Sequence, residues 1–294
     1  MEKHLIIGDG NIGRDLFQAL HNRGRSVHLV TKRMGFSWPD TGLAFIKQFN
    51  PSHVWICAGH GSVMESVSDF QNQVATLFTM PVDIRNVVPL GTKVCIFSTD
   101  YVADENDALN RNAFTHNPRS AYASTKLLLE QTLLRQGHPF TAIVRIGSVY
   151  GHHYPLKSFP GKVISNSFGS TCMIMPANVV TPTPSWWIAR ELITHIEQLF
   201  QSSTQVFHLM PKGSCSLAEW ARLFLHIPVE TKERDLTRPS IPGGIGSSFC
   251  ETQDWITLWE QSVPDFSMAI QRALSSKESP IASSSQQLAP LPPS

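Results

Sequence analysis

The sequence predicts an α/β fold with a doubly wound parallel sheet, followed by a smaller and less regular C-terminal part. Two observations indicate this fold. Short, continuously apolar runs alternate with longer amphipathic stretches as far as Gly151, and a glycine-rich turn joins the first run to the first stretch. Strands without a polar face are buried on both sides, which is typical of parallel sheets covered by helices.

The individual elements follow from hydrophobic periodicity. Buried strands are predicted at 4–8, 26–31, 53–59, 93–99, the first part of 140–151, and 205–210. Helices are predicted at 11–24, 69–87, 120–137, 186–200 and 216–227. The last of these helices opens with a serine and has a glutamate three residues on, which is the pattern of a capping box.

The glycine-rich turn lies directly between the first predicted strand and the first predicted helix. Gly8, Gly10 and Gly13 have the spacing G-x-G-x-x-G, and this context indicates a dinucleotide site in a Rossmann-type fold. The glycines allow a tight turn, while the helix N-terminus offers unpaired N–H groups to a pyrophosphate. We therefore expect the turn to bind a dinucleotide, with Asn11 and Ile12 included. A plain strand-to-helix turn is the alternative.

The charged residues at the end of the second predicted strand favour NADP over NAD. The second strand ends in Thr31, Lys32 and Arg33, without the acidic residue that binds the ribose 2′-hydroxyl in NAD sites. Lysine and arginine instead pair with a 2′-phosphate, so Lys32 and Arg33 are predicted to bind one. A solvated surface pair is the alternative. Asp9 must point away from a bound pyrophosphate.

The chain is predicted to have three parts. Residues 1–151 form the NAD(P)-binding Rossmann domain, and residues 152–274 form a substrate-binding part in which 181–210 returns to the main sheet. Residues 275–294 are rich in Ser, Pro and Gln and contain almost no large apolar side chains. Such a composition cannot bury a core, so we expect a disordered tail.

The composition excludes several classes of partner. The chain has 294 residues, of which 41% are hydrophobic and 16% charged, and its formal net charge is +1. A near-neutral protein has no charge footprint for nucleic acid or a membrane surface. The five cysteines form no CxxC pair, and no apolar run approaches the length of a membrane span. We therefore expect a cytoplasmic protein with free thiols.

The candidate reacting residues follow the fourth predicted strand. Thr99 lies at the carboxyl end of this strand, and ligands of open parallel sheets bind at such ends. Tyr122 and Lys126 are four residues apart on the next helix, so they share a face. The ammonium of Lys126 is expected to lower the pKa of Tyr122, which makes the phenol a candidate general acid and base. Ser98 is a secondary candidate.

Several longer segments carry a family resemblance. They are 97–105 (FSTDYVADE), 117–131 (NPRSAYASTKLLLEQ), 145–151 (RIGSVYG), 178–196, 206–224 and 237–240. Together with the glycine turn, they resemble the extended short-chain dehydrogenase/reductases, and within them the dTDP-4-dehydrorhamnose reductase group. The resemblance spans nearly the whole chain before the tail.

The resemblance implies an NADP-dependent reductase of a nucleotide-linked 4-keto sugar. Tyr122 would donate a proton to the keto oxygen as the nicotinamide hydride attacks the carbonyl carbon. Thr99 would hydrogen-bond that oxygen, and Lys126 would bind the nicotinamide ribose. The segment that passes the adenosine ribose and pyrophosphate corresponds to Cys57, Ala58 and Gly59.

The irregular C-terminal part would hold the sugar nucleotide. Arg145, Lys157 and Arg238 are candidates to pair with its diphosphate, and each could equally be a surface or structural charge. We expect no metal, because His152 and His153 lack further ligands at suitable spacing. Self-association into a homodimer is left open.

The chain also departs from the family pattern. Ile7 stands where the family has its first loop glycine, Ala103 begins a segment that replaces Phe-Asp-Gly, and His60 replaces an aromatic residue. Another deoxysugar or a non-sugar ketone therefore stays open as the substrate. The same catalytic residues could serve an epimerase or dehydratase that retains NAD. They could also persist in a non-catalytic NADP-binding subunit, such as the regulatory subunit of methionine adenosyltransferase.

Overall fold

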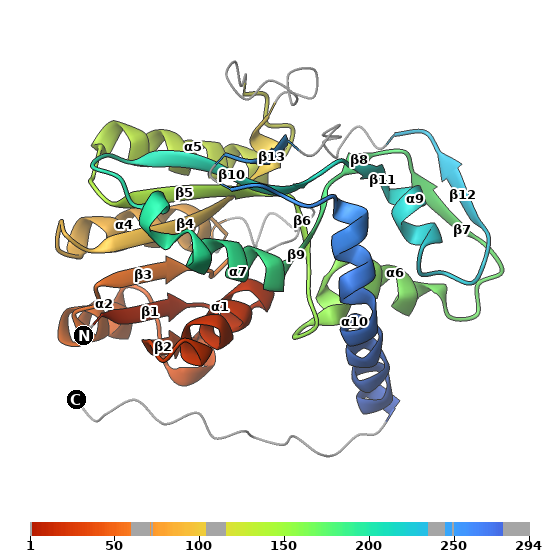
Figure 1. Cartoon of the computed structure of the whole chain (residues 1–294), viewed down its shortest axis with the longest axis horizontal. Helices are drawn as coiled ribbons and strands as arrows, with labels where there is room; N and C mark the ends of the chain where they lie inside the picture. The colour runs from red at the N-terminus through yellow and green to blue at the C-terminus, as the bar shows by residue number, and fades with distance from the viewer. Residues whose placement is uncertain are drawn as a thin grey trace.

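The central element is a seven-stranded sheet in the order β13-β10-β5-β4-β3-β1-β2 (Figure 1). The structure is a computed structural model that describes residues 2–59, 71, 73–103, 116–234, 245–248 and 250–278. The strands of the sheet are β1 (Lys3–Ile7), β2 (Ser26–Val30), β3 (His53–Ile56), β4 (Lys93–Thr99), β5 (Thr141–Ile146), β10 (Gln205–Lys212) and β13 (Ile245–Ser247). Neighbouring strands are parallel, except that β13 pairs antiparallel with β10.

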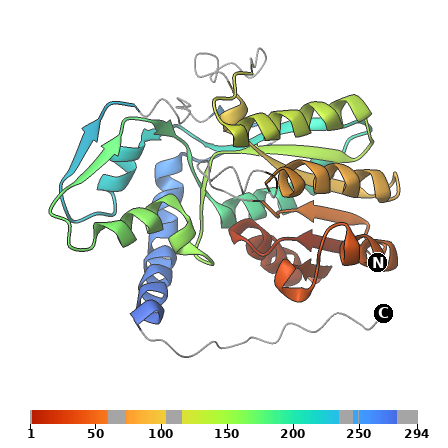
Figure 2. The ribbon, with the colours of Figure 1, turned by 180° about the vertical axis from the view of Figure 1, so that it is seen from behind.

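Helices cover both faces of this sheet, which confirms the doubly wound α/β fold. On one face lie α1 (Asn11–Asn22) and α7 (Ser185–Thr194), which pack on alternate strand residues such as Ile6 and Trp55. On the other face lie α2 (Asp40–Phe49), α4 (Met80–Val87) and α5 (Ala121–Gln136), in front of the sheet in Figure 2. These three helices pack on the intervening strand residues, among them Leu5 and Val54. The strands are therefore apolar throughout because both faces are buried.

The remaining elements form a second lobe beside the carboxyl ends of the central strands (Figure 1). Its helices are α6 (Phe159–Ser167), α9 (Leu217–Arg222) and α10 (Trp255–Glu278). Its strands form the pairs β6 (Ser148–Tyr150) with β9 (Pro182–Pro184), β7 (Met173–Pro176) with β12 (Val229–Lys232), and β8 (Val179–Val180) with β11 (Cys215–Ser216). The lobe has an aromatic core of its own around Tyr150, Trp220 and Trp259.

Several boundaries differ from the sequence-based expectations. The predicted helix at 186–200 breaks at His195 into α7 and α8 (Ile196–Leu199). The helix α9 starts with the expected capping box between Ser216 and Glu219, but it ends at Arg222. The helix α10 runs to Glu278 and so passes the start of the predicted tail at residue 275; residues 279–294 lie outside the described residues.

The segment 181–210 contributes to both lobes. Its strand β10 pairs with β5 in the main sheet, while α7 packs against α1. The indole Nε1 of Trp186 donates a hydrogen bond of 2.9 Å to Ser262 Oγ on α10. Among the described residues, no helix is long and apolar enough to cross a bilayer.

Candidate active site

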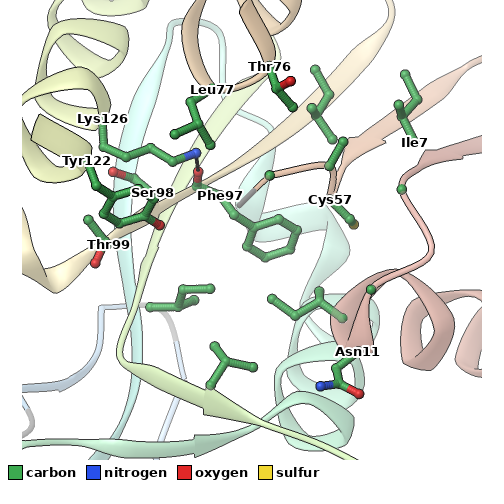
Figure 3. A pocket seen from close by; sticks show the side chains of 18 of the residues that line it. Ile7, Asn11, Cys57, Thr76, Leu77, Phe97, Ser98, Thr99, Tyr122 and Lys126 are labelled. Carbon is green, nitrogen blue, oxygen red and sulfur yellow. Dashed lines mark hydrogen bonds between the residues drawn. The ribbon is translucent and has the colours of Figure 1, made fainter. Parts of the chain in front are cut away.

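A cavity of ≈ 1180 Å³ lies at the carboxyl ends of the central strands. The glycine-rich turn, the ends of β2, β3 and β4, the start of α5 and part of the second lobe contribute to its wall. Figure 3 shows side chains of β4 and α5 on one side of this cavity and Ile7, Asn11 and Cys57 on the other. The cavity therefore brings together most of the residues that the sequence indicates.

The glycine-rich turn has the conformation of a dinucleotide cradle. Gly8 has a φ of +106°, and a Cβ there would lie 2.6 Å from the backbone N of Ala58. Gly10 precedes α1 without a capping side chain and faces open space. Gly13 is not part of the cavity wall; its Cβ would collide with the carbonyl oxygen of Gly8. Gly13 therefore allows the helix to pack against the turn, whereas Gly8, Gly10 and Asn11 face the cavity together with Ile12.

Asp9 lines the cavity, and other side chains engage its carboxylate. Tyr154 donates its hydroxyl to Asp9 Oδ2 over 3.0 Å, and Arg14 Nη2 lies 3.5 Å from the same oxygen. The backbone N–H of Tyr154 also donates to Asn11 Oδ1 over 2.8 Å. The charge of Asp9 is thus offset where it stands, and the segment after β6 is fastened to the start of α1.

The two cations after β2 are placed differently. They lie in the short helix η1 (Lys32–Met34), and both are exposed. Lys32 lines the cavity, but Arg33 is not part of its wall. Of these two cations, Lys32 is therefore the one that can reach a ligand in the cavity.

The end of β3 supplies the next part of the wall through Cys57, Ala58 and Gly59. The backbone N–H of Cys57 donates to the carbonyl of Ile7 over 2.9 Å, which holds this segment beside the glycine turn. Burial raises the pKa of the Cys57 thiol well above its ordinary value. The thiol is therefore protonated at neutral pH and acts as an apolar wall rather than as a nucleophile.

Thr99, Tyr122 and Lys126 all line the same cavity (Figure 3). Ser120 caps α5 by accepting from the N–H of Ala123 over 3.1 Å, so Tyr122 falls in the first turn of the helix. Lys126 is buried, and its Nζ donates a hydrogen bond of 2.8 Å to the carbonyl of Phe97. Local capping and one tertiary hydrogen bond thus place the phenol and the amine beside the end of β4.

The expected effect of Lys126 on Tyr122 is wrong for this structure. Desolvation raises the pKa of the half-buried Tyr122, and the nearby Asp100 raises it further. Burial also lowers the pKa of Lys126 to about 8, and its Nζ is bonded to a carbonyl oxygen. Tyr122 is therefore protonated at neutral pH, which is the state that a proton donor needs.

Asp100 is a site residue that the motif does not mark. Its Oδ1 accepts from Thr99 Oγ1 over 3.2 Å, and its side chain is 2% exposed. Its Oδ2 and the Oγ of Ser98, both in the cavity wall, have no hydrogen-bond partner among the residues that the structure describes. Burial raises the pKa of Asp100 to about 7, although the hydrogen bond from Thr99 opposes the rise. A buried acid with an unused oxygen thus lies directly behind Thr99.

The candidates for binding a substrate diphosphate occupy different environments: Arg145 is in a buried ion pair, and Lys157 lies in the cavity wall. Arg145 is buried and forms a two-point ion pair with Glu130, with distances of 3.0 Å from Nε and 2.6 Å from Nη2. It therefore holds β5 to α5 and lies outside the cavity wall, which is the structural role that the sequence left open beside a diphosphate contact. Lys157 does line the cavity, and so does Lys162 on α6, which sequence periodicity could not single out. Arg238 lies outside the described residues.

The two adjacent histidines have a third partner after all. Asp15 Oδ1 lies 3.0 Å from His153 Nε2 and 4.0 Å from His152 Nε2, and these three side chains are within the range of metal ligands. Ser185 Oγ donates to Asp15 Oδ2 over 2.5 Å. The cluster joins α1, the segment after β6 and the start of α7. Sequence spacing does not reveal this third group, and the expectation of no metal stays a prediction.

The family of this chain follows from comparison with known proteins. The family described as RmlD substrate binding domain matches residues 2–239. This chain belongs to that family. It is an oxidoreductase of the NAD(P)-dependent, short-chain dehydrogenase/reductase type.

Solved structures agree with this fold. A dTDP-4-dehydrorhamnose reductase from Bacillus anthracis in complex with NADP has a TM-score of 0.78 and 18% identity, covering 90% of this chain and 99% of its own. A second such reductase, from Clostridium acetobutylicum, has a TM-score of 0.73 and 21% identity, covering 89% and 98%. MoeE5 in complex with UDP-glucose and NAD has a TM-score of 0.72 and 16% identity, covering 92% and 99%. No curated protein matches the chain significantly.

Proposed function

We propose that this protein is an NADPH-dependent reductase that converts the keto group of a nucleotide-linked 4-keto sugar to an alcohol. One observation carries the proposal: a single cavity joins the glycine-rich turn to Thr99, Tyr122 and Lys126, and continues to the lysines of the second lobe. Structural similarity to proteins named dTDP-4-dehydrorhamnose reductases supports this substrate class.

The residues of the cavity fit a bound NADP. Gly10 leaves room for a pyrophosphate to approach the backbone at the N-terminus of α1, and Gly8 lets the turn lie against the segment after β3. Lys32 offers a cation at the end of β2, where the 2′-phosphate of NADP distinguishes it from NAD. When bound, NADPH supplies the hydride. One similar structure holds NADP, and another similar structure holds NAD.

Tyr122 is the proton donor in this proposal. Its O–H bond breaks as the carbonyl carbon is reduced, and the proton moves to the keto oxygen to complete the alcohol. Thr99 offers a second hydroxyl to the same oxygen. Lys126 would bind the nicotinamide ribose in this proposal, and solvent would return the proton to Tyr122. Both hydroxyls and the amine lie in one wall of the cavity.

The substrate end of the cavity combines cations with an apolar surface. Lys157 and Lys162 offer two exposed ammonium groups to a diphosphate, and Phe159 and Leu217 offer apolar area to the rest of the nucleotide sugar. The Lys157 Nζ lies 4.7 Å above the ring of Tyr154, which restricts where this cation can go. A phosphate bound here would meet cations without the help of Arg145.

The proposal is tested by following NADPH oxidation with dTDP-4-dehydrorhamnose. The variant Tyr122→Phe should lose about 100- to 10,000-fold in turnover, because it lacks the proton that general acid catalysis needs. Its affinity for NADPH should stay unchanged. The matched control is Tyr150→Phe, which removes a buried phenol hydroxyl from the core of the second lobe and should keep its turnover.

Two results would contradict this proposal. Full turnover by Tyr122→Phe would remove the tyrosine from the chemistry. Absence of NADPH oxidation by the wild-type protein, together with retained cofactor, would favour an epimerase, a dehydratase or a non-catalytic binding subunit.

A further inference from the structure

The end of the cavity beyond β2 is built by residues that no sequence motif marks. In Rossmann-type sites the pyrophosphate lies on the glycine turn and the adenosine ribose lies at the end of β2, so the base lies beyond that strand. Here the wall beyond Lys32 consists of the segment that leads into α2 and one face of α4. Both helices cover the same face of the sheet (Figure 2). The residues at this end are Phe36, Ser37, Trp38, Pro39, Met80 and Asp83.

A hydrogen bond connects the two sides of this end of the cavity. Trp38 Nε1 donates to Asp83 Oδ2 over 3.1 Å. Trp38 is partly buried and packs against the core beneath α2 and α4, so its indole is a fixed donor. Asp83 lies on α4, which continues the π-helix η2 (Ala75–Thr79) without a break, so the carboxylate is held within a longer helix. The bond therefore orients a charged acceptor in the cavity wall.

The second oxygen of this carboxylate is available to a ligand. Asp83 Oδ1 has no hydrogen-bond partner among the described residues, and no lysine or arginine there forms an ion pair with Asp83. An ionised carboxylate only accepts hydrogen bonds, so it repels phosphates and selects for a donor. The donor that adenine offers along its edge is the exocyclic 6-amino group.

We propose that Asp83, oriented by Trp38, accepts a hydrogen bond from the 6-amino group of the cofactor's adenine and thereby selects adenine over hypoxanthine. Phe36, Trp38 and Met80 provide the apolar walls that a planar base needs. The inference rests on the proposed cofactor and not on the proposed sugar substrate.

The test is a fluorescence titration of the full-length protein with two dinucleotides. One is NADPH, and the other is reduced nicotinamide hypoxanthine dinucleotide phosphate, in which an oxo group replaces the 6-amino group. A hydrogen bond to a charged group should make the wild-type protein bind NADPH about 10- to 100-fold more tightly than the analogue.

The variant Asp83→Asn should reverse this preference. Its amide oxygen can accept from Trp38, which turns the amide NH₂ group toward the base. That group repels the amino group of adenine but donates to the oxo group of hypoxanthine. A merely structural role for Asp83 would weaken both dinucleotides equally and would not reverse their order.

Two further variants complete the test. Trp38→Phe keeps an aromatic ring but removes the donor that orients Asp83, so the affinity for NADPH should fall more than the affinity for the analogue. Asp40→Asn is the matched control, because this exposed carboxylate lies two residues from Trp38 and outside the cavity wall. It should leave the preference unchanged.

Equal binding of both dinucleotides by the wild-type protein would overturn the inference, and so would an unchanged preference in Asp83→Asn. If the wild-type protein bound neither dinucleotide, the cofactor assignment would fall with it. Failure to reduce the sugar substrate would leave these titrations unaffected, so the two proposals fail separately.

Discussion

At the scale of single residues, Asp100 shows how position changes the chemistry of a side chain. It directly follows β4, holds the hydroxyl hydrogen of Thr99 through Oδ1, and is 2% exposed. When ionised, this carboxylate draws the Thr99 hydroxyl away from a substrate oxygen. When protonated, it can donate its own hydrogen to Thr99 and leave the Thr99 hydrogen for the substrate. The pKa of about 7 places both states within the working range of pH.

The raised pKa of Asp100 predicts how the free energy of unfolding changes with pH. Burial raises the pKa of Asp100 from 3.8 in the unfolded chain to about 7 in the folded protein. The folded protein therefore binds more protons between these values, so this group stabilises the fold at low pH and the contribution is lost as pH rises to about 7. In Asp100→Asn this decline in the free energy of unfolding, on the order of 4 kcal/mol, should disappear.

Urea denaturation at a series of pH values measures this effect. The two proteins are compared by the slope of the free energy of unfolding against pH. A loss of stability that is the same at every pH does not change this slope. Identical slopes for wild type and Asp100→Asn would show that the carboxyl group titrates normally in the folded protein.

Arg145 and Glu130 show what sequence cannot reveal at this scale. An arginine at the end of a predicted strand is compatible with binding a diphosphate and equally with a structural role, and the sequence left both open. Its partner lies on α5, and both side chains are buried, with exposures of 5% and 1%. Removing one member of such a pair would leave the other charge buried without a partner, which destabilises the fold. The pair therefore has a structural role. Only the tertiary contact distinguishes these roles.

At the scale of elements, the glycine-rich turn separates two uses of glycine. Gly10 faces open space in the cavity, whereas a Cβ on Gly13 would collide with the backbone of Gly8. One glycine therefore leaves room for a ligand, and the other allows α1 to pack against the turn. The shared motif G-x-G-x-x-G does not distinguish them.

Alanine substitutions should separate these two uses. Gly10→Ala should leave the thermal midpoint unchanged and raise the Kd for NADPH by about tenfold or more, because its Cβ occupies the approach to the backbone. Gly13→Ala should destabilise the protein by about 1–3 kcal/mol, because backbone must move. Thermal unfolding and NADPH titration measure both effects. Equal thermal midpoints for the two variants would contradict this assignment.

The other helices and strands can be predicted only where a short stretch of sequence carries a clear hydrophobic pattern. The strands of the parallel sheet are continuous apolar runs, and the sequence indicates them well. The helices α2 and α10 are not indicated. Helix α10 contains Pro264, a residue that ordinarily interrupts a helix, and its apolar residues face the second lobe. The break at His195 is equally hidden, because the apolar pattern continues across it.

At the scale of the whole molecule, the candidate site depends on contacts between distant segments. The sequence predicts the parts of the site that lie in motifs: the glycine turn, the segment after β3, and Thr99 with Tyr122 and Lys126. Asp15 meets His153 across 138 positions of the chain, and Trp38 meets Asp83 across 45. No local pattern encodes such pairs, so the structure was needed to find them.

The two lobes also explain how one cavity could hold the proposed cofactor together with the proposed substrate. The carboxyl ends of the parallel strands and the start of α5 supply the turn and the candidate catalytic residues, and the second lobe adds Lys157 and Lys162. A cofactor bound on the sheet and a substrate bound by the second lobe would therefore meet beside Tyr122. This arrangement underlies the central claim that a hydride passes to a keto sugar and leaves with the product.

Isotope transfer tests that claim most directly. The protein is incubated with dTDP-4-dehydrorhamnose and NADPH that carries deuterium at the transferred position, and the product is examined by mass spectrometry and NMR. A reductase places one deuterium on the newly formed alcohol carbon for each NADPH consumed. An unlabelled product, with the deuterium retained in bound cofactor, would contradict the proposed reduction and indicate an epimerase or dehydratase.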